Sequence, residues 1–336
     1  MNAPGKIVLY FIAVFVLGAA LAPPLFWAVQ AAKGAAESRG WIHYETREKP
    51  VKKGDRPRKN EVKEMETKTR GPLRWLDAGF GKVADRATIF AAVILLVPLF
   101  RSLRIRSTAE LGLDRNPSRV RHFLVAYATA VGMMALLAFI LLRIGIYVLK
   151  QPTPWGDLLF PAISGLAVAF LEEWIFRGAF LGTFRRSMKP WAALAAVSVL
   201  FAFVHFIQPR ERPELNVVHS WSGFELLPHR FESFTEPGLL FGGFVTLFCF
   251  GWVCGWATLR TRGLAMAMGF HAGMVLGKFG FNRIAERSDN RDLLPWLGED
   301  LAVGLVAVGI VILVGSFLWL FLRYVAPPPH RSTSAD

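Results

Sequence analysis

The sequence predicts an all-α, polytopic membrane bundle of about eight transmembrane helices. Hydrophobic residues make up 53% of the 336-residue chain, the mean hydropathy is +0.38, and apolar runs too long for a soluble core recur along it. The formal net charge of +14 comes mostly from Lys and Arg between these runs, where such residues set topology and bind anionic lipid. We therefore expect membrane lipid as a partner and no nucleic acid, because no aromatic-basic binding module is visible.

Apolar segments separated by charged ones define the expected helices. The shortest of them, residues 87–100, has only 14 residues and contains Pro98, so an interfacial or re-entrant segment is the alternative there. The expected spans are residues 7–31, 87–100, 123–149, 157–184, 190–207, 238–259, 263–281 and 301–325.

The domain organisation follows from these runs. We expect a first span within residues 1–31, a charged extramembrane loop at 32–86, a membrane bundle at 87–325 and a disordered tail at 326–336. The loop holds 15 Lys or Arg and 9 Asp or Glu, a composition typical of solvated, partly disordered segments. The first run could also be a cleaved signal peptide, but it exceeds the usual apolar core of about 7–15 residues, which favours a retained span.

The charges between the spans predict the orientation. Eight helices place both termini on one side, and the short segments after the second, fourth and sixth spans are basic. The positive-inside rule then places the termini in the cytoplasm; the basic first loop opposes this, but its length weakens the rule there. We expect an integral protein of a bacterial inner membrane with cytoplasmic termini.

Charged groups inside apolar spans are costly and mark functional sites. Glu173 and Arg177 lie about 40° apart on an ideal helix, whereas Glu172 lies about 140° from Arg177. Glu173 is thus expected to be the counter-ion of Arg177, leaving Glu172 free to act. The ionisable residues deep in the expected spans are Glu172, Glu173, Arg177, His205 and His271.

Three of these side chains are expected at one depth in the membrane. At a rise of 1.5 Å per residue, Glu172, His205 and His271 lie roughly 18, 22 and 12 Å from the same presumed end of their spans. Tilt makes each value uncertain by about a turn. The three groups are therefore expected in one layer.

The combination of residue types indicates acyl hydrolysis. This reaction needs a base that activates water, a group that holds the water and a donor for the oxyanion. A buried glutamate gains basicity; His205 is expected to share the water and His271 to supply the donor. Taken singly, a membrane histidine is as often a packing residue, and a Glu–Arg pair could belong to the proton relay of a transporter. A transporter is disfavoured because no inverted repeat is apparent.

The remaining small residues predict packing. Gly269, Gly273 and Gly277 form a stripe that lets a neighbouring helix approach closely. Cys249 and Cys254 lie within one apolar run, where we interpret both as small hydrophobic residues, with no disulfide or cysteine-based zinc site.

Three motifs resemble those of a known family. The sequence EEWIFRG at Glu172–Gly178 resembles EExxxR, FAFVH at Phe201–His205 resembles FxxxH, and GFHAGMV around His271 resembles the third motif, HxxxN or HxxxD. These are the motifs of the CPBP family of intramembrane proteases, also called the CAAX protease and bacteriocin-processing family. They occur in the family's order within about residues 157–281, which we take as the protease core.

The resemblance implies a mostly helical intramembrane protease. It implies that Glu172 and His205 activate the attacking water and that His271 stabilises the oxyanion. It also implies supporting roles for Glu173 and Arg177, and Phe201 belongs to the second motif.

One position departs from the family pattern. Val275 occupies the place of the Asn or Asp four residues after His271, and valine has no side-chain donor. The oxyanion role there falls to His271 alone, passes to Lys278 or Asn282, or is lost. A non-enzymatic membrane scaffold or immunity-type partner is therefore the alternative to an endopeptidase.

The expected substrate is a peptide or protein with a membrane-proximal or C-terminal tail, and the sequence does not choose among such tails. Two histidines and a glutamate could bind zinc with an open fourth position. The chain lacks HExxH, however, so we expect a glutamate-activated water with no metal or other cofactor.

Overall fold

The prediction of an all-α membrane protein is confirmed. The computed structural model describes residues 3–48, 65–69, 71–105, 107, 116–207, 215, 217–288, 293–298 and 301–325. Among these residues, six helices are long and apolar enough to cross a membrane. They are Ala3–Ser38, Phe80–Ser102, Arg119–Arg143, Leu159–Phe184, Leu240–Thr261 and Leu305–Val325.

All eight expected spans are helical, but several boundaries differ from the prediction. Helices α1 (Ala3–Ser38) and α2 (Phe80–Ser102) extend into the segment predicted as a loop. Helix α3 (Arg119–Arg143) ends before residue 149, because Tyr147–Leu149 forms strand β3. The predicted tail, residues 326–336, lies outside the described residues.

The helices form two compact units, which we describe separately. The first comprises the described parts of residues 3–6, 100–207 and 231–325. It contains the short helix α6 and the central helix α9, neither of which is among the six long apolar ones. In chain order, its helices include α3, η3 (Trp155–Leu158), α4 (Leu159–Glu173), η4 (Trp174–Leu181), α5 (Gly182–Phe184), α6 (Pro190–Phe206), α8 (Pro237–Thr261), α9 (Ala265–Ile284), α10 (Leu305–Leu320) and η6 (Phe321–Val325).

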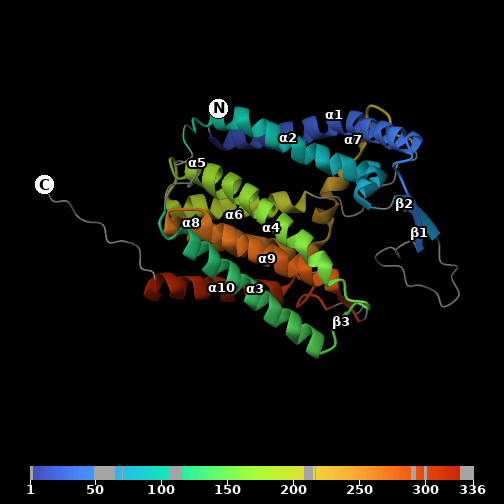
Figure 1. The fold of residues 1–336 in the computed structure, drawn as a ribbon. Coiled ribbons are helices and arrows are strands. Elements are labelled where there is room, and N and C mark those ends of the chain that lie inside the picture. The colour runs from blue at the N-terminus through green and yellow to red at the C-terminus, as the bar shows by residue number, and fades with distance from the viewer. Residues whose placement is uncertain are drawn as a thin grey trace. The chain divides into compact units, whose positions relative to one another are not determined.

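Helix α9 is the centre of this unit, packed against α3, α4 and α8 (Figure 1). The predicted glycine stripe makes the contact with α3: a methyl group at Gly269 would lie 2.2 Å from the Phe123 carbonyl oxygen. At Gly273 it would lie 2.7 Å from Cβ of Ala130. The stripe thus permits backbone contact between the two helices, as predicted.

The far end of α9 is held by a small sheet and a lysine. Strand β3 pairs antiparallel with β4 (Ala285–Arg287), which directly follows α9. Lys150 Nζ donates to the carbonyl oxygens of Asn282 and Arg283 at 2.8 and 3.0 Å. A cation at a helix C-terminus satisfies its free carbonyls and complements the helix dipole.

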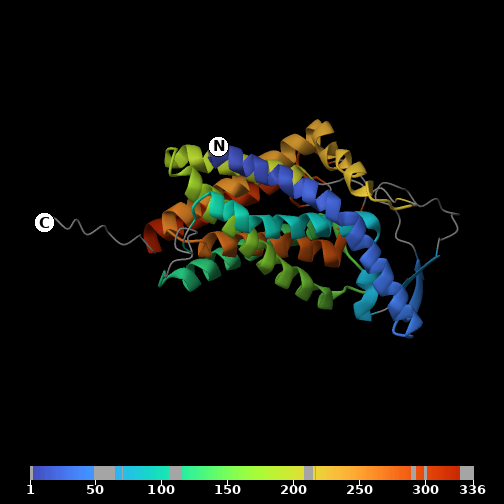
Figure 2. The same cartoon turned by 90° about the horizontal axis from the view of Figure 1, so that it is seen from above.

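The second unit comprises the described parts of residues 7–99 and 215–230. Helix α1, at 36 residues, is about 54 Å long, well beyond the roughly 30 Å hydrocarbon core. At its C-terminal end lies the antiparallel hairpin β1 (Tyr44–Glu48) and β2 (Met65–Thr69), followed by η1 (Gly71–Asp77) (Figures 1 and 2). The predicted loop therefore contains regular structure; residues 49–64 and 70 of its charged block lie outside the described residues.

Two polar clusters tie the second unit together. Asp77 accepts from the Thr69 amide at 2.6 Å and lies 2.9 Å from Lys33 of α1. Arg230 is 7% exposed and lies 3.2 Å from Asp85 of α2. Through Arg230, the segment that contains α7 (Ser222–Glu225) is anchored to α2.

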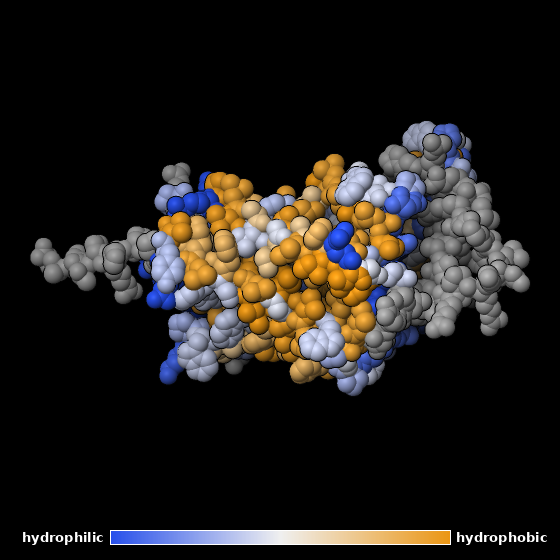
Figure 3. Space-filling view, turned by 90° about the horizontal axis from the view of Figure 1, so that it is seen from below, coloured by the Kyte–Doolittle hydropathy of each residue, from blue (hydrophilic) through white to orange (hydrophobic). Residues whose placement is uncertain are grey.

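Many large apolar side chains remain exposed on the long helices. Examples are Leu124, Leu136 and Phe139 of α3, and Ile312 and Phe317 of α10. The face drawn in Figure 3 carries a broad band of apolar residues. Such a surface is matched by the hydrocarbon of a bilayer.

Candidate active site

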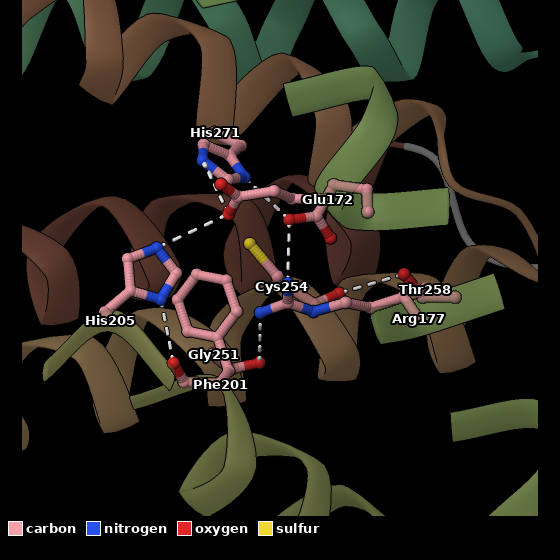
Figure 4. A network of polar contacts seen from close by, with 9 residues as sticks. Glu172, Arg177, Phe201, His205, Gly251, Cys254, Thr258 and His271 are labelled. Atoms are coloured by element: carbon pink, nitrogen blue, oxygen red, sulfur yellow. Dashed lines mark hydrogen bonds and ion pairs between the residues drawn. The ribbon is translucent and has the colours of Figure 1, made fainter. Parts of the chain in front are cut away.

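The six residues singled out in the sequence come together from three helices of the first unit (Figure 4). Glu172 and Glu173 are the last two residues of α4, and the π-helical segment η4 begins at the next residue. Short π-helical segments inside α-helices are frequent at functional sites. Phe201 and His205 lie one turn apart on α6, and His271 lies on α9.

Glu173 is the buried centre of the site. Its Oε1 accepts from Arg177 Nη1 at 2.9 Å and from His271 Nδ1 at 2.8 Å. The side chains of Glu173 and Arg177 are both 0% exposed, and Arg177 also donates to the Gly251 carbonyl oxygen at 3.2 Å. The predicted Glu173–Arg177 pair is therefore present. The contact of Glu173 with His271 was not predicted.

Glu172 faces two histidines, one of which, His271, also contacts Glu173. Its Oε2 lies 3.4 Å from His205 Nε2 and 3.9 Å from His271 Nε2. That oxygen is shielded from solvent and makes no hydrogen bond within the described residues. The side chains of Glu172 and His205 are nevertheless 26% and 25% exposed, so this edge of the site is more open than the Glu173–Arg177 pair.

The hydrogen-bond partners of Nδ1 in His205 and His271 determine which tautomer each neutral imidazole adopts. His205 Nδ1 lies 2.8 Å from the Phe201 carbonyl oxygen, which can only accept, so this nitrogen carries the hydrogen. His271 Nδ1 likewise faces the Glu173 carboxylate and donates to it. Both Nε2 atoms are then lone-pair acceptors that face Glu172 when the rings are neutral.

The Phe201 ring packs against both Arg177 and His205. The Arg177 guanidinium lies over the Phe201 ring, 4.4 Å from its centroid, and the His205 ring centroid lies 4.2 Å from that of Phe201. Phe201 is 1% exposed and also stacks on Phe250 at 5.7 Å. The cation–π contact and the stacking fix the ring, which in turn packs against His205.

Helix α8 contributes residues that the sequence analysis missed. The Gly251 carbonyl binds Arg177, the Phe250 ring packs edge-on to His271 at 4.9 Å, and Cys254 is fully buried beside the polar network. The residues Gly251 and Gly255 form a GxxxG pattern, which could have indicated close helix contact. No charged residue in this run indicated a site.

Val275 packs against helix α4. A methyl group at Gly165 of α4 would lie 3.1 Å from Val275 Cγ1, so the valine fills the α4–α9 contact. The alternative donors, Lys278 and Asn282, lie 7 and 11 residues after His271, or roughly 10 and 16 Å along the helix. Neither therefore lies at the level of His271.

The arrangement of side chains gives no metal cluster. Among the described residues, no group of three or more His, Cys, Asp or Glu side chains is placed to hold a metal ion. The histidine and glutamate groups instead contact one another directly, as described above.

Comparisons with known proteins bear on the same segment. No curated protein and no solved structure matches the chain. One family model, described as Type II CAAX prenyl endopeptidase Rce1-like, matches residues 154–277. This range contains all six site residues and nearly coincides with the predicted protease core at 157–281. Residues 154–277 are therefore similar to the Rce1-like family of CAAX proteases, and this similarity supports an intramembrane protease.

Proposed function

We propose that the protein is an intramembrane endopeptidase that hydrolyses a peptide bond by means of a water activated by Glu172 and His205. The observation that carries this proposal is the convergence of three acceptors, Glu172 Oε2 and the Nε2 atoms of His205 and His271. Both Nδ1 hydrogens point away from Glu172 Oε2, toward the Phe201 carbonyl and the Glu173 carboxylate. The three acceptors therefore need a hydrogen-bond donor between them. A water molecule supplies two O–H donors and fits this requirement.

The proton transfers follow from the same contacts. Glu172 takes a proton from the water as its oxygen attacks the carbonyl carbon, and His205 orients the water through Nε2. The proton then passes from Glu172 to the leaving amine as the peptide bond breaks. His271 is oriented by the bond between its Nδ1 and Glu173, and it donates to the oxyanion when its Nε2 carries a hydrogen.

Two groups position these residues. Arg177 holds Glu173, which holds His271, and the Phe201 carbonyl holds His205. Val275 has no side-chain hydrogen-bond donor, so we assign the stabilisation of the oxyanion to His271 alone. We propose no metal and no other cofactor, since the glutamate itself serves as the base.

The proposed substrate is a peptide or protein with a membrane-proximal or C-terminal tail. His205 is the penultimate residue of α6, a helix of 17 residues and thus about 25 Å long, shorter than the hydrocarbon core. A site at the end of such a helix suits cleavage near the membrane surface. We propose a bacterial inner-membrane location with cytoplasmic termini, with membrane lipid as a further partner and no nucleic acid.

Glu172→Gln and His205→Ala should each abolish cleavage, because each removes one acceptor that holds the water. The purified protein is assayed in detergent with a panel of tail peptides, prenylated and unprenylated, with and without a chelator. His219 and Glu225 form a matched control, a surface Glu–His pair at 3.2 Å with both side chains about half exposed. His219→Ala and Glu225→Gln should leave cleavage unchanged.

The outcomes separate the alternatives. Loss in both site variants, with no chelator effect, supports the glutamate mechanism. Cleavage abolished by the chelator would overturn the metal-free mechanism in favour of zinc. A wild-type protein that cleaves no peptide in the panel, but whose cellular function survives Glu172→Gln, would favour the non-enzymatic scaffold, the alternative that Val275 keeps open.

A further inference from the structure

Five exposed arginines of the first unit lie where three of its long apolar helices meet. The Asn116 side chain, just before α3, donates to the Thr261 carbonyl oxygen at the end of α8 at 3.1 Å. The Arg121 guanidinium of α3 lies 5.6 Å from the ring centroid of Phe321, where η6 begins at the end of α10. The start of α3 therefore meets the ends of the other two helices. We call these residues the arginine cluster; they are Arg119, Arg121, Arg260, Arg262 and Arg323.

The described part of the protein does not neutralise the charge of this cluster. Arg119 and Arg121 lie in the first turn of α3, where the helix dipole favours acidic side chains, and no acidic residue is present in that turn. Arg262 ends α8 in a left-handed conformation, with φ 53° and ψ 37°, which glycine adopts more readily than other residues. Among the described residues, the five arginines form no ion pair with an acidic side chain. A bound anion would offset the repulsion between them.

The surroundings of the cluster are those of a membrane surface. The Arg323 guanidinium lies 4.9 Å from the ring centroid of Trp319 and 5.3 Å from that of Tyr324, and both rings are exposed. Exposed Trp and Tyr side chains at the ends of membrane helices are typical of the interface between hydrocarbon and water. Leu124, three residues after Arg121 on the same face of α3, is also exposed. Charged and apolar binding surfaces are therefore adjacent, as the two parts of a phospholipid require.

We propose that the arginine cluster binds the phosphate of an anionic phospholipid, whose acyl chains lie against the exposed apolar side chains of α3. Guanidinium groups bind phosphate through paired, charge-assisted hydrogen bonds. A zwitterionic phospholipid brings its own cation to the site and therefore neutralises the cluster less. The proposal specifies the lipid partner proposed above, and it does not depend on the proposed cleavage.

Thermal unfolding of the full chain in neutral detergent tests this proposal. Phosphatidylglycerol is titrated into the protein, with phosphatidylcholine, inorganic phosphate and a soluble oligoglutamate peptide as the other probes. We expect phosphatidylglycerol to raise Tm and the other three to have little effect at the same concentration. Equal effects of the two lipids, or an equal rise in Tm with either soluble probe, overturn the proposal.

Two arginines with the same backbone conformation form a matched pair of variants. Arg104 ends α2 with φ 56°, and the carbonyl oxygen before it, that of Leu103, accepts from Arg186 of the turn after α5. Arg262→Gly and Arg104→Gly each remove one positive charge from a left-handed position, so neither should lower Tm in neutral detergent. Only Arg262→Gly should raise the phosphatidylglycerol concentration needed for half of the stabilisation. We expect about a 10-fold increase, the effect of losing a charge-assisted hydrogen bond.

A second pair of variants leaves the backbone unstrained. Arg121→Gln should weaken the effect of phosphatidylglycerol as Arg262→Gly does, whereas Arg185→Gln, at an exposed arginine outside the cluster, should not. Equal weakening inside and outside the cluster would show attraction to total charge alone and overturn the proposal. These measurements use no peptide substrate, so a failure of the proposed cleavage and a failure of this proposal are separate results.

Discussion

At the residue scale, two adjacent glutamates have different environments. Glu173 is fully buried and accepts from Arg177 and His271, whereas Glu172 is partly exposed and faces the Nε2 atoms of two histidines. Successive helical residues point about 100° apart, which directs the two carboxylates into different surroundings. One carboxylate can thus be held as a counter-ion while its neighbour acts as a base.

Removing Arg177 should destabilise the protein strongly. Arg177→Met leaves the buried Glu173 carboxylate without its cation, and breaking a buried pair in this way costs about 3–5 kcal/mol. The expected result is a lower Tm in detergent, measured by thermal unfolding. Arg185→Met, at an exposed arginine, is the control and should change Tm little. Equal Tm values for the two variants would contradict the structural role of Arg177.

Asp77 should make the hairpin end of the second unit sensitive to acid. Burial raises the pKa of the Asp77 carboxyl, but the hydrogen bonds from Lys33 and Thr69 lower it by more, so the net pKa lies below its usual value. A carboxyl with a lowered pKa stabilises the folded state above its unfolded pKa, about 3.9. That contribution is lost as the pH falls through the lower, folded-state pKa.

Hydrogen exchange of residues 65–77 should therefore accelerate on acidification below about pH 4. Exchange rates are corrected for their intrinsic pH dependence and measured by mass spectrometry on the full chain. Asp77→Asn should exchange faster at neutral pH and lose the acid-dependent step. A variant that keeps the step unchanged would assign it to another group.

At the element scale, helix contacts place the groups that we propose to be catalytic. Helix α9 carries His271 between two glycines that contact α3, so the position of the imidazole depends on how closely the two backbones approach. Helix α8 approaches α6 in the same way, since a methyl group at Gly251 would lie 3.1 Å from Ser198 Cα. The carbonyl of this same glycine binds Arg177.

Gly269→Ala should disturb both stability and activity. Its methyl group would lie 2.2 Å from the Phe123 carbonyl oxygen, so the two helices must separate, at a cost of about 1–3 kcal/mol. We expect a lower Tm and a lower kcat, because His271 lies two residues away. Gly132→Ala on the facing helix α3 is the control, since its methyl group meets no atom within 4 Å. If Gly132→Ala lowers Tm as much as Gly269→Ala does, the close contact of Gly269 with α3 does not explain the effect.

At the scale of the whole molecule, the bilayer determines which residues face outward. The long helices expose large apolar side chains, and basic residues gather in the short turns that follow α5 and α8. Arg185, Arg186 and Lys189 belong to the first of these turns, and Arg262 to the second. By the positive-inside rule we expect these turns to face the cytoplasm.

Two reporters test this orientation. A fluorescent protein that folds only in the cytoplasm should be bright at the C-terminus, and a periplasmic enzyme reporter should be active when inserted between β1 and β2. The two sites are expected on opposite sides because α1 separates the N-terminus from the hairpin. If the fluorescent protein is fluorescent when inserted between β1 and β2 but not when fused to the C-terminus, the orientation is the opposite of the one expected.

Local patterns in the sequence were sufficient for the membrane helices and for the candidate residues of the site. A long apolar run in a bilayer must satisfy its backbone hydrogen bonds internally, so a helix follows from hydropathy alone. The i, i+4 spacing likewise placed Glu173 beside Arg177, and the motif order indicated Glu172, His205 and His271. These features depend on residues close together in the chain.

Only the tertiary structure decided the long-range partners. Glu173 and His271 are 98 positions apart, and nothing local in the sequence indicates that Oε1 would bind both His271 and Arg177. Gly251, Phe250 and Cys254 were likewise not indicated as site residues, because they lie in an apolar run without a charge. The hairpin was also not predicted, since its strands lie in the segment expected to be a loop. Hydropathy determines that a helix enters the membrane; the approach of one backbone to another determines which side chains meet there.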